Sequence, residues 1–315
     1  MTILITGADG FIGRALVQRL LGAASLAAGV SDRLVLLDRS FASPPTDPRV
    51  RCVSGDLTEP EVLREAVGSG ADLVFHLASI PGGAAEADFA LGLNVNLVGT
   101  LSLLEQLRAQ SRRATLVFAS TIGVYGVPMP ALIEESTVPA PSLSYGAEKL
   151  AAEILLSDYS RRGFVDGRSL RLPGIVARPP ARSGLLSAFL SDLIRMLSAG
   201  GRFTCPVSAD GKCWWMSRPC VIDNLLHAAR LDVTAQAGRR VWLLPVLHAS
   251  IGQIVEAIAA ICGAEVLERV TYRPDAALQA QFASYPPLSC PASVGAGFRN
   301  DGSLDSLVRR ALEGP

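Results

Sequence analysis

The sequence predicts an α/β fold: a Rossmann-like, doubly wound parallel sheet with a small C-terminal substrate-binding cap. The first half of the chain alternates short runs rich in Val, Ile and Leu with amphipathic segments. Apolar runs without polar alternation are typical of strands buried on both faces of a parallel sheet. Their regular alternation with helices is typical of doubly wound folds.

The predicted strands and helices alternate along the chain up to Leu172. A long connection, Gly22–Arg33, separates the first helix from the second strand. The expected strands are Thr2–Thr6, Leu34–Leu37, Val50–Val53, Leu73–Leu77 and Leu116–Ala119, and the expected helices are Phe11–Leu21, Glu59–Val67, Phe89–Arg108 and Tyr145–Arg162.

The pattern changes after Leu172, where prolines and glycines cluster. We expect a helix over Leu185–Leu197, a strand over Val241–Leu244 and a helix from a Ser250 cap through Ile261. Beyond about Gly263 the chain is rich in Pro and Ala and weakly periodic. We therefore expect a first domain over 1–172 that regains 220–262, and a small substrate-binding domain over 173–219 and 263–315.

Composition excludes several classes of function. The chain has 315 residues, 49% of them hydrophobic, with 29 basic and 29 acidic side chains. Zero net charge argues against binding to nucleic acid or to an anionic membrane surface. The six cysteines form no CxxC pair, so neither a metal site nor a disulfide framework is expected. The opening residues lack the pattern of a secretory signal, and no apolar run is long enough to span a membrane, so we expect a cytoplasmic protein.

A Gly-rich turn joins the first expected strand to the first expected helix. Glycines at such a turn let the backbone approach a pyrophosphate, which then lies at the helix N-terminus. The position of this turn, directly after a buried strand, predicts a dinucleotide site. The residues expected to contact the dinucleotide there are Gly7, Gly10, Phe11, Ile12 and Gly13.

Two acidic residues follow the next strands. Asp38 ends the second strand, where a carboxylate accepts hydrogen bonds from the adenosine ribose and repels a 2′-phosphate, which favours NAD over NADP. Arg39 follows at once and could contact a phosphate instead. Asp56-Leu57, after the third strand, stands where an acceptor for the adenine edge is useful, although a solvated turn residue fits the pattern nearly as well.

A tyrosine and a lysine stand four residues apart on one expected helix. The chain has five tyrosines and two lysines, so the pair Tyr145–Lys149 is unusual by chance. An ammonium near a phenol favours the phenolate, which makes tyrosine a usable base near neutral pH. Ser120-Thr121 ends the fifth strand, at the edge of the sheet where ligands bind in such folds. A hydroxyl there can bind the substrate oxygen that gains or loses a proton.

These motifs together resemble the extended short-chain dehydrogenase/reductases, also called the NAD-dependent epimerase/dehydratase family. The resemblance covers about residues 1–180, in motif order. Further motifs that contribute to it are His76-Leu77-Ala78-Ser79, Asn96-Leu-Val-Gly99-Thr100 and Val124-Tyr125-Gly126.

The resemblance implies NAD as the cofactor and a role for each matched residue. Thr121 takes the position of the catalytic hydroxyl, Tyr145 that of the base, and Lys149 that of the anchor for the nicotinamide ribose. Ala78 and Ser79 would line the cofactor path, Asn96 would support the lysine through water, and Pro173 and Ile175 would touch the nicotinamide. His76 and Tyr125 are expected to be structural.

Departures from the family pattern narrow the reaction. Sugar-nucleotide dehydratases carry an Asp-Glu pair after the catalytic hydroxyl, where this chain has Ile122-Gly123. Nucleotide-sugar epimerases usually carry Asn where this chain has Gly174. The stretch Leu155–Pro179 resembles a subgroup that oxidises the 2-hydroxyl of a D-erythronate-like, four-carbon sugar acid with NAD. We therefore expect a small-acid dehydrogenase, with a nucleotide-sugar 4-epimerase as the alternative and a non-catalytic NAD(H)-binding regulator as a third.

A small acid substrate needs a partner for its carboxylate. Arg178 follows the segment expected at the nicotinamide, and Arg218 follows Trp214-Trp215-Met216, whose bulk could close the pocket from water. A backbone nest around Gly82-Gly83 is another way to hold the acid. The residues expected to contact the substrate are Ser79, Thr121, Ile122, Tyr145, Arg178 and Arg218. The resemblance further implies a homodimer formed through Phe89–Arg108 and Tyr145–Arg162.

Overall fold

The computed structural model describes residues 1–22, 32–68, 70–180 and 187–313. The chain forms two compact units, and each is described by itself. The first unit comprises residues 1–124, 143–171 and 225–242, and the second comprises 125–142, 172–224 and 243–315. The expected long connection over Gly22–Arg33 lies almost wholly outside the described residues.

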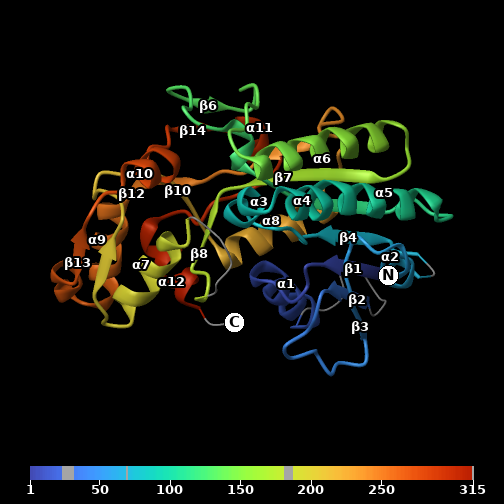
Figure 1. Ribbon diagram of the computed structural model, residues 1–315, viewed down its shortest axis with the longest axis horizontal. Coiled ribbons are helices and arrows are strands. Elements are labelled where there is room, and N and C mark those ends of the chain that lie inside the picture. The colour runs from blue at the N-terminus through green and yellow to red at the C-terminus, as the bar shows by residue number, and fades with distance from the viewer. Residues whose placement is uncertain (23–31, 69, 181–186, 314–315) are drawn as a thin grey trace. The chain divides into compact units, whose positions relative to one another are not determined.

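A seven-stranded sheet forms the centre of the first unit (Figure 1). The chain adds strands in one direction from β1 to β3, returns to the other side of β1 with β4, and continues outward. This reversal makes the sheet doubly wound, and in such sheets ligands bind at the carboxyl ends of the strands where the order reverses, here β1 and β4. The spatial order is β11 (Val241–Leu243), β7 (Asp166–Leu172), β5 (Thr115–Thr121), β4 (Leu73–His76), β1 (Thr2–Thr6), β2 (Arg33–Asp38) and β3 (Val50–Ser54).

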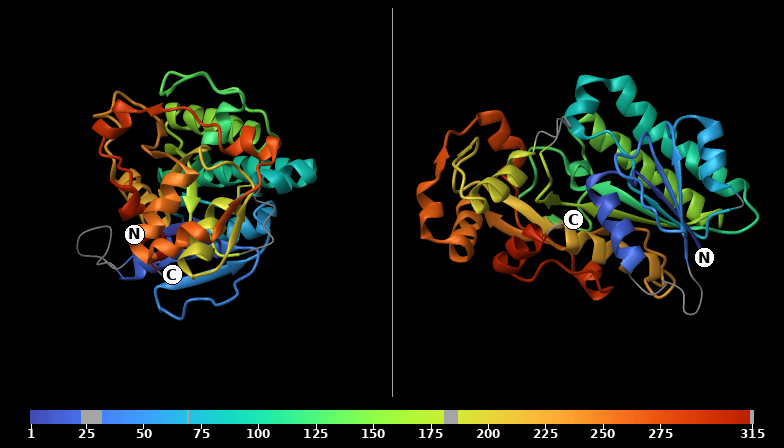
Figure 2. Two further views of the ribbon diagram at one scale, coloured as in Figure 1. Left: turned by 90° about the vertical axis from the view of Figure 1, so that its left-hand side faces the viewer. Right: turned by 90° about the horizontal axis from the view of Figure 1, so that it is seen from below.

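The strands from β5 to β3 are parallel, as their continuous apolar runs predict. Helices α2, α5 and α6 bury their apolar sides in one core with this sheet. Figures 1 and 2 show α5 and α6 side by side. The helical elements of this part of the chain are α1 (Phe11–Gly22), α2 (Pro60–Val67), α3 (Gly82–Ala87), α4 (Phe89–Leu93), the π-helix η1 (Asn94–Gly99), α5 (Thr100–Ala109), the 3-10 helix η2 (Ile122–Tyr125) and α6 (Ser144–Arg161).

The expected continuous helix over Phe89–Arg108 is wrong in detail. A π-helical turn, Asn94–Gly99, separates α4 from α5. The hydroxyl of Thr100 donates to the carbonyl oxygen of Asn96 at 2.7 Å, and it also contacts His76. A side chain that bonds to the backbone of its own helix in this way competes with regular helical hydrogen bonds.

The second unit is built around β10, a strand whose side chains are almost completely buried. β10 pairs with β8 in parallel and with β12 in antiparallel. The remaining elements of the chain are β6 (Ile133–Glu134), β8 (Gly174–Val176), α7 (Phe189–Ser198), β9 (Phe203–Cys205), β10 (Lys212–Ser217), α8 (Arg218–Arg230), β12 (Leu247–Ser250), α9 (Ile251–Cys262), η3 (Ala264–Glu268), β13 (Val270–Tyr272), α10 (Ala276–Phe282), β14 (Leu288–Ser289), α11 (Pro291–Gly295) and α12 (Leu304–Leu312).

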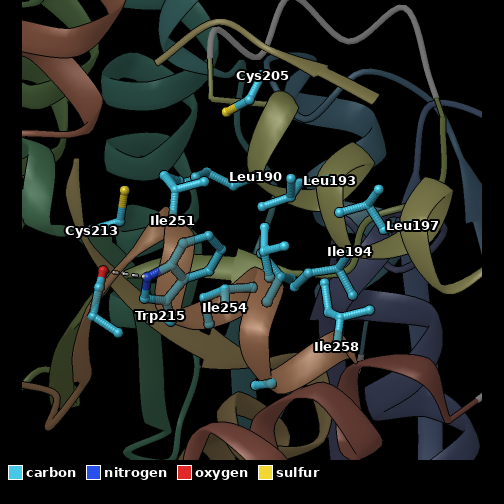
Figure 3. Close-up of a cluster of buried hydrophobic side chains, with 14 of the residues drawn as sticks. Leu190, Leu193, Ile194, Leu197, Cys205, Cys213, Trp215, Ile251, Ile254 and Ile258 are labelled. Carbon is cyan, nitrogen blue, oxygen red and sulfur yellow. Dashed lines mark hydrogen bonds between the residues drawn. The ribbon is translucent and has the colours of Figure 1, made fainter. Parts of the chain in front are cut away.

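Trp215 lies in the middle of the hydrophobic core of this unit (Figure 3). Its indole N–H donates to the carbonyl oxygen of Ala249 at 3.0 Å, and the side chain is completely buried. Trp214 is also completely buried and donates to the carbonyl oxygen of Pro286 at 2.7 Å. Both indoles therefore fill the interior of the unit, which differs from the expected role of closing a pocket.

The domain boundaries also differ from those expected. Of the segment 220–262, only 225–242 belongs to the first unit. Helix α9 begins at a Ser250 capping box, as expected. Its buried face, which includes Ile251, Ile254 and Ile258, packs in the core of the second unit with α7 and α12. The predicted helix over Leu185–Leu197 is observed from Phe189, and Leu185 and Leu186 lie outside the described residues.

Glycines permit the turn between β1 and α1. Gly7 has φ +68°, and a Cβ atom at that residue would lie 2.7 Å from the backbone nitrogen of Ala78. A Cβ at Gly13 would lie 2.1 Å from the carbonyl oxygen of Gly7. The strand, the turn and the helix therefore approach one another more closely than any side chain allows.

We predict that Gly13→Ala lowers the free energy of unfolding by about 2 kcal/mol or more, because the methyl group overlaps backbone atoms that cannot move independently. Gly22→Ala on the same helix is the control, since a Cβ there meets no atom within 4 Å. We expect that control to change stability by less than about 0.5 kcal/mol. Urea denaturation followed by circular dichroism measures both, and equal midpoints for the two variants would contradict the packing argument.

Candidate active site

The turn at Gly7–Gly13 fits a dinucleotide. Gly7 and Gly13 allow the turn to pack directly against backbone atoms, where no side chain fits, and α1 begins directly after Gly10. Free N–H groups at the start of a helix of this length attract the negative charge of a phosphate. Phe11 and Ile12 form the first turn of α1 and are half-buried.

Asp38 lies at the carboxyl end of β2 and joins this turn to the sheet. Its carboxylate accepts hydrogen bonds from the backbone N–H groups of Asp9 and Arg39, each at 2.8 Å. Partial burial raises the pKa of Asp38, and these two hydrogen bonds oppose that effect. Arg39 itself is exposed. The residue expected to bind the ribose therefore also fixes the glycine turn.

Asp56 and Leu57 have local structural contacts. One carboxylate oxygen of Asp56 accepts from both the backbone N–H and the hydroxyl of Thr58, each at 2.8 Å. This Asx turn leads into α2. Leu57 is 6% exposed and belongs to the core between the sheet and its helices. These contacts fit the turn interpretation of Asp56 that the sequence left open.

His76 is a completely buried, neutral side chain that joins β1, β4 and α5. Burial and the nearby Lys149 lower the pKa of His76 to about 3. Its Nδ1 lies 2.6 Å from the hydroxyl of Thr6, and its Nε2 lies 2.8 Å from the hydroxyl of Thr100. Because Thr100 donates its single hydroxyl proton to Asn96, Nε2 must carry the proton of the imidazole. Nδ1 then accepts from the hydroxyl of Thr6. The imidazole therefore has one defined tautomer, with the proton on Nε2, and its contacts fit the expected structural role.

The loop after β4 is held at two points on either side of Ser79. The hydroxyl of Thr6 accepts from the backbone N–H of Ala78 at 3.3 Å. Asn96 accepts from the N–H of Ile80 at 2.8 Å and donates to its carbonyl oxygen at 3.1 Å. Ala78 and Ser79, the residues expected along the cofactor path, are therefore fixed to β1 and η1.

Asn96 also donates to a carboxylate oxygen of Glu148 at 2.6 Å. Both N–H groups of its side chain are used by Ile80 and Glu148. Asn96 therefore contacts the residue next to Lys149, and the support of the lysine through water that the resemblance implies stays a prediction.

Two glycines, Gly82 and Gly123, lie close to the side chain of Tyr145. A Cβ atom at Gly82 would be 3.8 Å from Cβ of Tyr145. A Cβ atom at Gly123 would be 4.0 Å from Cδ1 of the tyrosine ring and 3.3 Å from the hydroxyl oxygen of Thr121. The same hydroxyl accepts from the N–H of Gly123 at 3.0 Å. The structure thus brings the Thr121 hydroxyl and the Tyr145 ring close to the same residue, Gly123.

Lys149 lies one turn further along α6 and is 1% exposed. Its ammonium nitrogen lies 4.6 Å from the centre of the Phe118 ring and 5.8 Å from the centre of the Tyr145 ring. Burial lowers the pKa of Lys149 to about 7, while Glu148 and Glu153 oppose this change. The ammonium therefore lies close to the phenol, in an environment that disfavours its charge.

Sequence reasoning missed two buried charged residues beside this pair, Glu153 and Arg171. Glu153 accepts from the hydroxyl of Ser120 and from the guanidinium of Arg171. Glu153 stands four residues after Lys149, just as Lys149 stands four residues after Tyr145. This repeated spacing places all three on one side of the helix and would have indicated Glu153. Arg171 had no sequence signal, because its pairing joins residues distant in the chain.

Four of the expected residues belong to the second unit. Pro173 precedes β8, and Ile175 pairs with Met216 on β10. Arg178 follows β8 and is half-buried. The fourth residue of the second unit is Arg218. Ile122, by contrast, belongs to the first unit and is 7% exposed in η2.

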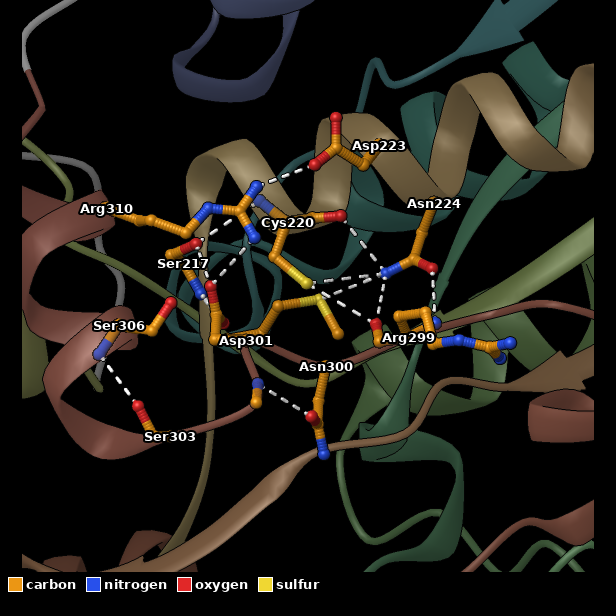
Figure 4. Close-up of polar contacts among 12 residues, drawn as sticks. Ser217, Cys220, Asp223, Asn224, Arg299, Asn300, Asp301, Ser303, Ser306 and Arg310 are labelled. Atoms are coloured by element: carbon orange, nitrogen blue, oxygen red, sulfur yellow. Dashed lines mark hydrogen bonds and ion pairs between the residues drawn. The ribbon is translucent and has the colours of Figure 1, made fainter.

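Arg218 begins α8 and donates to the carbonyl oxygen of Glu313 at 3.3 Å. Burial lowers its pKa. The turn before it is fixed by Ser217, whose N–H donates to buried Asp301 at 2.8 Å, and Arg310 pairs with Asp301 and Asp223 (Figure 4). The backbone at Arg218 is therefore held in place within the second unit.

Among the described residues, no group of three or more His, Cys, Asp or Glu side chains could hold a metal ion. Within the same parts of the chain, every helix is too short or too polar to cross a membrane.

The chain is similar to known proteins over its whole length. Residues 3–216 match the NAD dependent epimerase/dehydratase family. A D-erythronate dehydrogenase from Cupriavidus necator is 37% identical, with 99% of this chain and 98% of that protein covered. A D-erythronate dehydrogenase from Haemophilus influenzae is 31% identical, with 99% of each chain covered.

A solved structure has the same fold over nearly all of the chain. The nucleoside-diphosphate-sugar epimerase from Agrobacterium tumefaciens is 32% identical, with a TM-score of 0.91 and coverage of 98% of this chain and 92% of that one. The family match, the full-length relatives and the glycine turn over a doubly wound sheet agree. The chain therefore belongs to the NAD-dependent epimerase/dehydratase family and is an oxidoreductase that uses a nicotinamide cofactor.

Proposed function

We propose that this protein oxidises the 2-hydroxyl of a small, D-erythronate-like sugar acid to the 2-oxo acid, with NAD as the cofactor. The observation that carries the proposal is the grouping of Thr121, Tyr145 and Lys149: the Thr121 hydroxyl and the Tyr145 ring both lie beside Gly123, and the Lys149 ammonium lies 5.8 Å from the centre of that ring. The similarity to two D-erythronate dehydrogenases over the whole chain supports the substrate class.

Each of the three side chains has a task in this reaction. Tyr145, as the phenolate, takes the proton of the 2-hydroxyl, and Thr121 hydrogen-bonds to the same substrate oxygen. The Lys149 ammonium, 5.8 Å from the centre of the tyrosine ring, stabilises the phenolate and binds the nicotinamide ribose. When bound, NAD would supply the acceptor for the hydride that leaves C2 of the substrate. Gly7–Gly13 and Ala78–Ser79 would hold the dinucleotide, with Pro173 and Ile175 at the nicotinamide.

A nucleotide-sugar 4-epimerase is the second candidate. The similarity to the Agrobacterium tumefaciens epimerase structure favours it. An epimerase returns its hydride to the substrate, so net formation of NADH separates the two functions. A regulator that binds NAD(H) without catalysis is the least supported, because Thr121, Tyr145 and Lys149 are all present.

We expect NADH to form with one or more aldonic acids of four to six carbons, measured by absorbance. Tyr145→Phe should lower kcat by about 10²- to 10⁴-fold, because the proton acceptor is lost, while NADH binding persists. Lys149→Met should impair both turnover and NADH binding. Tyr159→Phe, on the same helix and bonded to Glu105, is the control and should retain activity. Near-full activity of Tyr145→Phe would contradict the mechanism.

We propose that Asp38 makes NAD the preferred cofactor. Asp38→Asn keeps an oxygen that can accept from Asp9 but removes the charge that repels a 2′-phosphate. The ratio of kcat/KM with NADP to that with NAD should rise by about tenfold or more, which equals about 1.4 kcal/mol. Asp38→Ala removes the acceptor as well and should also weaken binding of both cofactors. A native preference for NADP would overturn the proposal and would favour Arg39 as a phosphate ligand.

We propose that Arg178 or Arg218 binds the substrate carboxylate. Both belong to the second unit and are half-buried, and a guanidinium can bind a carboxylate through two parallel hydrogen bonds. A backbone nest around Gly82-Gly83, where α3 begins, is the alternative way to hold the acid without an arginine. Ser79 and Ile122 would complete the substrate contacts.

The arginine that binds the acid should be identified by replacing each with Met and comparing an aldonic acid with its uncharged polyol analogue. The true anchor should lose about 10²-fold or more in kcat/KM toward the acid and change little toward the polyol. Arg202→Met, at an exposed position of the same unit, is the control. Equal losses on both substrates, or no loss in either variant, would argue against arginine anchoring.

We also propose a cytoplasmic location. All six cysteines carry free thiols. Free thiols are typical of proteins in a reducing compartment. The proposed use of NAD fits the same compartment.

We propose that the protein is a homodimer formed through α4, η1, α5 and α6. Large apolar side chains are exposed on these helices, with Phe89 at 59%, Val98 at 44% and Ile154 at 63%. Ile154→Glu should shift sedimentation equilibrium from dimer to monomer, because it buries a charge in the interface. Val138→Glu, at an apolar position that is 80% exposed in the second unit, should leave the dimer intact. A monomeric unmodified protein would exclude the proposal.

A further inference from the structure

The helix that carries the proposed base has three functional groups at equal spacing. Tyr145, Lys149 and Glu153 each stand four residues apart on α6, so they share one side of the helix. Glu153 is 2% exposed, which is unusual for a carboxylate. A buried charge of this kind requires partners that offset its lost hydration.

The partners of Glu153 come from two neighbouring strands. Arg171 on β7 donates through Nε at 3.1 Å to one carboxylate oxygen and through Nη2 at 2.8 Å to the other. Ser120 on β5 donates its hydroxyl proton to the first of these oxygens. Ser120 is 2% exposed and Arg171 is 8% exposed, so water does not weaken these contacts. One carboxylate therefore joins α6 to β5 and β7.

We propose that Glu153 is a positioning residue for the reaction: with Arg171 it fixes the end of β5 that carries Thr121, and its charge acts on the Tyr145–Lys149 pair. The proposal rests on the roles of Tyr145 and Lys149 given above. Thr121 follows Ser120 directly, so the Ser120–Glu153 hydrogen bond sets where the catalytic hydroxyl lies relative to the helix that carries the base.

The charges around Lys149 give the expected sign of the electrostatic effect. On α6, Glu148 and Glu153 favour the protonated amine, and the Tyr145 ring centre lies 5.8 Å from it. On β4, neutral His76 contributes no charge, and on β5 the neighbour of the ammonium is the Phe118 ring.

On β7, Arg171 is paired with Glu153 at 2.8 Å and carries the opposite charge, so we expect it to disfavour the protonated amine. On η1, Asn96 is uncharged and bonds to Glu148. Removal of the Glu153 charge should therefore favour the deprotonated forms of both the lysine and the phenol. Removal of the Arg171 charge should have the opposite effect.

The test is the pH dependence of kcat in single and double variants. Glu153→Gln keeps an acceptor for Ser120 and should shift the profile to lower pH by about half a unit or more. Arg171→Met should shift the profile to higher pH by a similar amount. The double variant removes both charges, leaves no unpaired buried ion and should restore a profile near that of the native protein.

Ser120→Ala separates the positioning effect from the electrostatic one. This variant leaves both charges in place and should lower kcat by about tenfold without a shift of the profile. If either single charge variant fails to fold, Ser120→Ala and the double variant still test the proposal. Shifts in the same direction for Glu153→Gln and Arg171→Met, unchanged profiles in both, or full activity of Ser120→Ala would overturn it.

A second readout does not depend on the substrate. The tyrosinate absorbance of each variant, minus that of the same variant with Tyr145→Phe, follows ionisation of Tyr145 alone. The Glu153→Gln and Arg171→Met titrations should shift in opposite directions even if no aldonic acid is oxidised. Failure of the proposed substrate class is thereby distinguished from failure of this inference, because only the latter abolishes the opposite shifts.

Discussion

Lys149 is 1% exposed, so its ammonium has lost nearly all of its hydration. The buried polar side chains around it in the first unit offset this loss of solvation free energy. Lys149 is accompanied on α6 by two buried carboxylates, Glu148 and Glu153. Each carboxylate is in turn bonded to a side chain from another element, Asn96 in the first case and Arg171 in the second. The charge of one lysine is thus offset through contacts that reach η1 and β7.

Hydrogen bonds of Asn96 also connect the strand before the glycine turn to the helix that carries the proposed catalytic residues. The side chain of Asn96 accepts a hydrogen bond from the backbone N–H of Ile80. The backbone carbonyl oxygen of Asn96 accepts one from the hydroxyl of Thr100. Thr100 accepts from neutral His76, which accepts from Thr6 at the end of β1. A single chain of directed hydrogen bonds therefore runs from the strand before the glycine turn to the π-helix beside α6. Side chains in such a chain have one arrangement available to them, which favours a rigid site.

The sequence predicted most of the first unit because its signals are local. Buried parallel strands are continuous apolar runs, and the glycine turn and the Tyr145–Lys149 spacing are short motifs. The division of Phe89–Arg108 was not predictable, since the π-helical turn involves a contact of Thr100 with His76 on another element. The pairing of Glu153 with Arg171 was hidden for the same reason.

The second unit was predicted less well, because its core is assembled from distant segments. The tryptophans of β10 read as pocket residues in isolation, yet Trp215 packs against α7 and α9. Helix α12 was overlooked because its buried face is small: only Leu307 and Val308 are buried. Short amphipathic helices of this kind are stabilised mainly by tertiary packing, which a single sequence does not display.

Asp38 has a consequence for how cofactor choice can change in such a protein. Its carboxylate is part of the backbone framework, since it receives the N–H of Asp9 from the glycine turn as well as the N–H of Arg39. With the role proposed for Asp38, replacement by Ala removes the acceptor for both N–H groups together with the charge, whereas Asn keeps one oxygen that can still accept from Asp9. A change of cofactor preference that preserves the loop geometry therefore requires an uncharged residue that is still a hydrogen-bond acceptor.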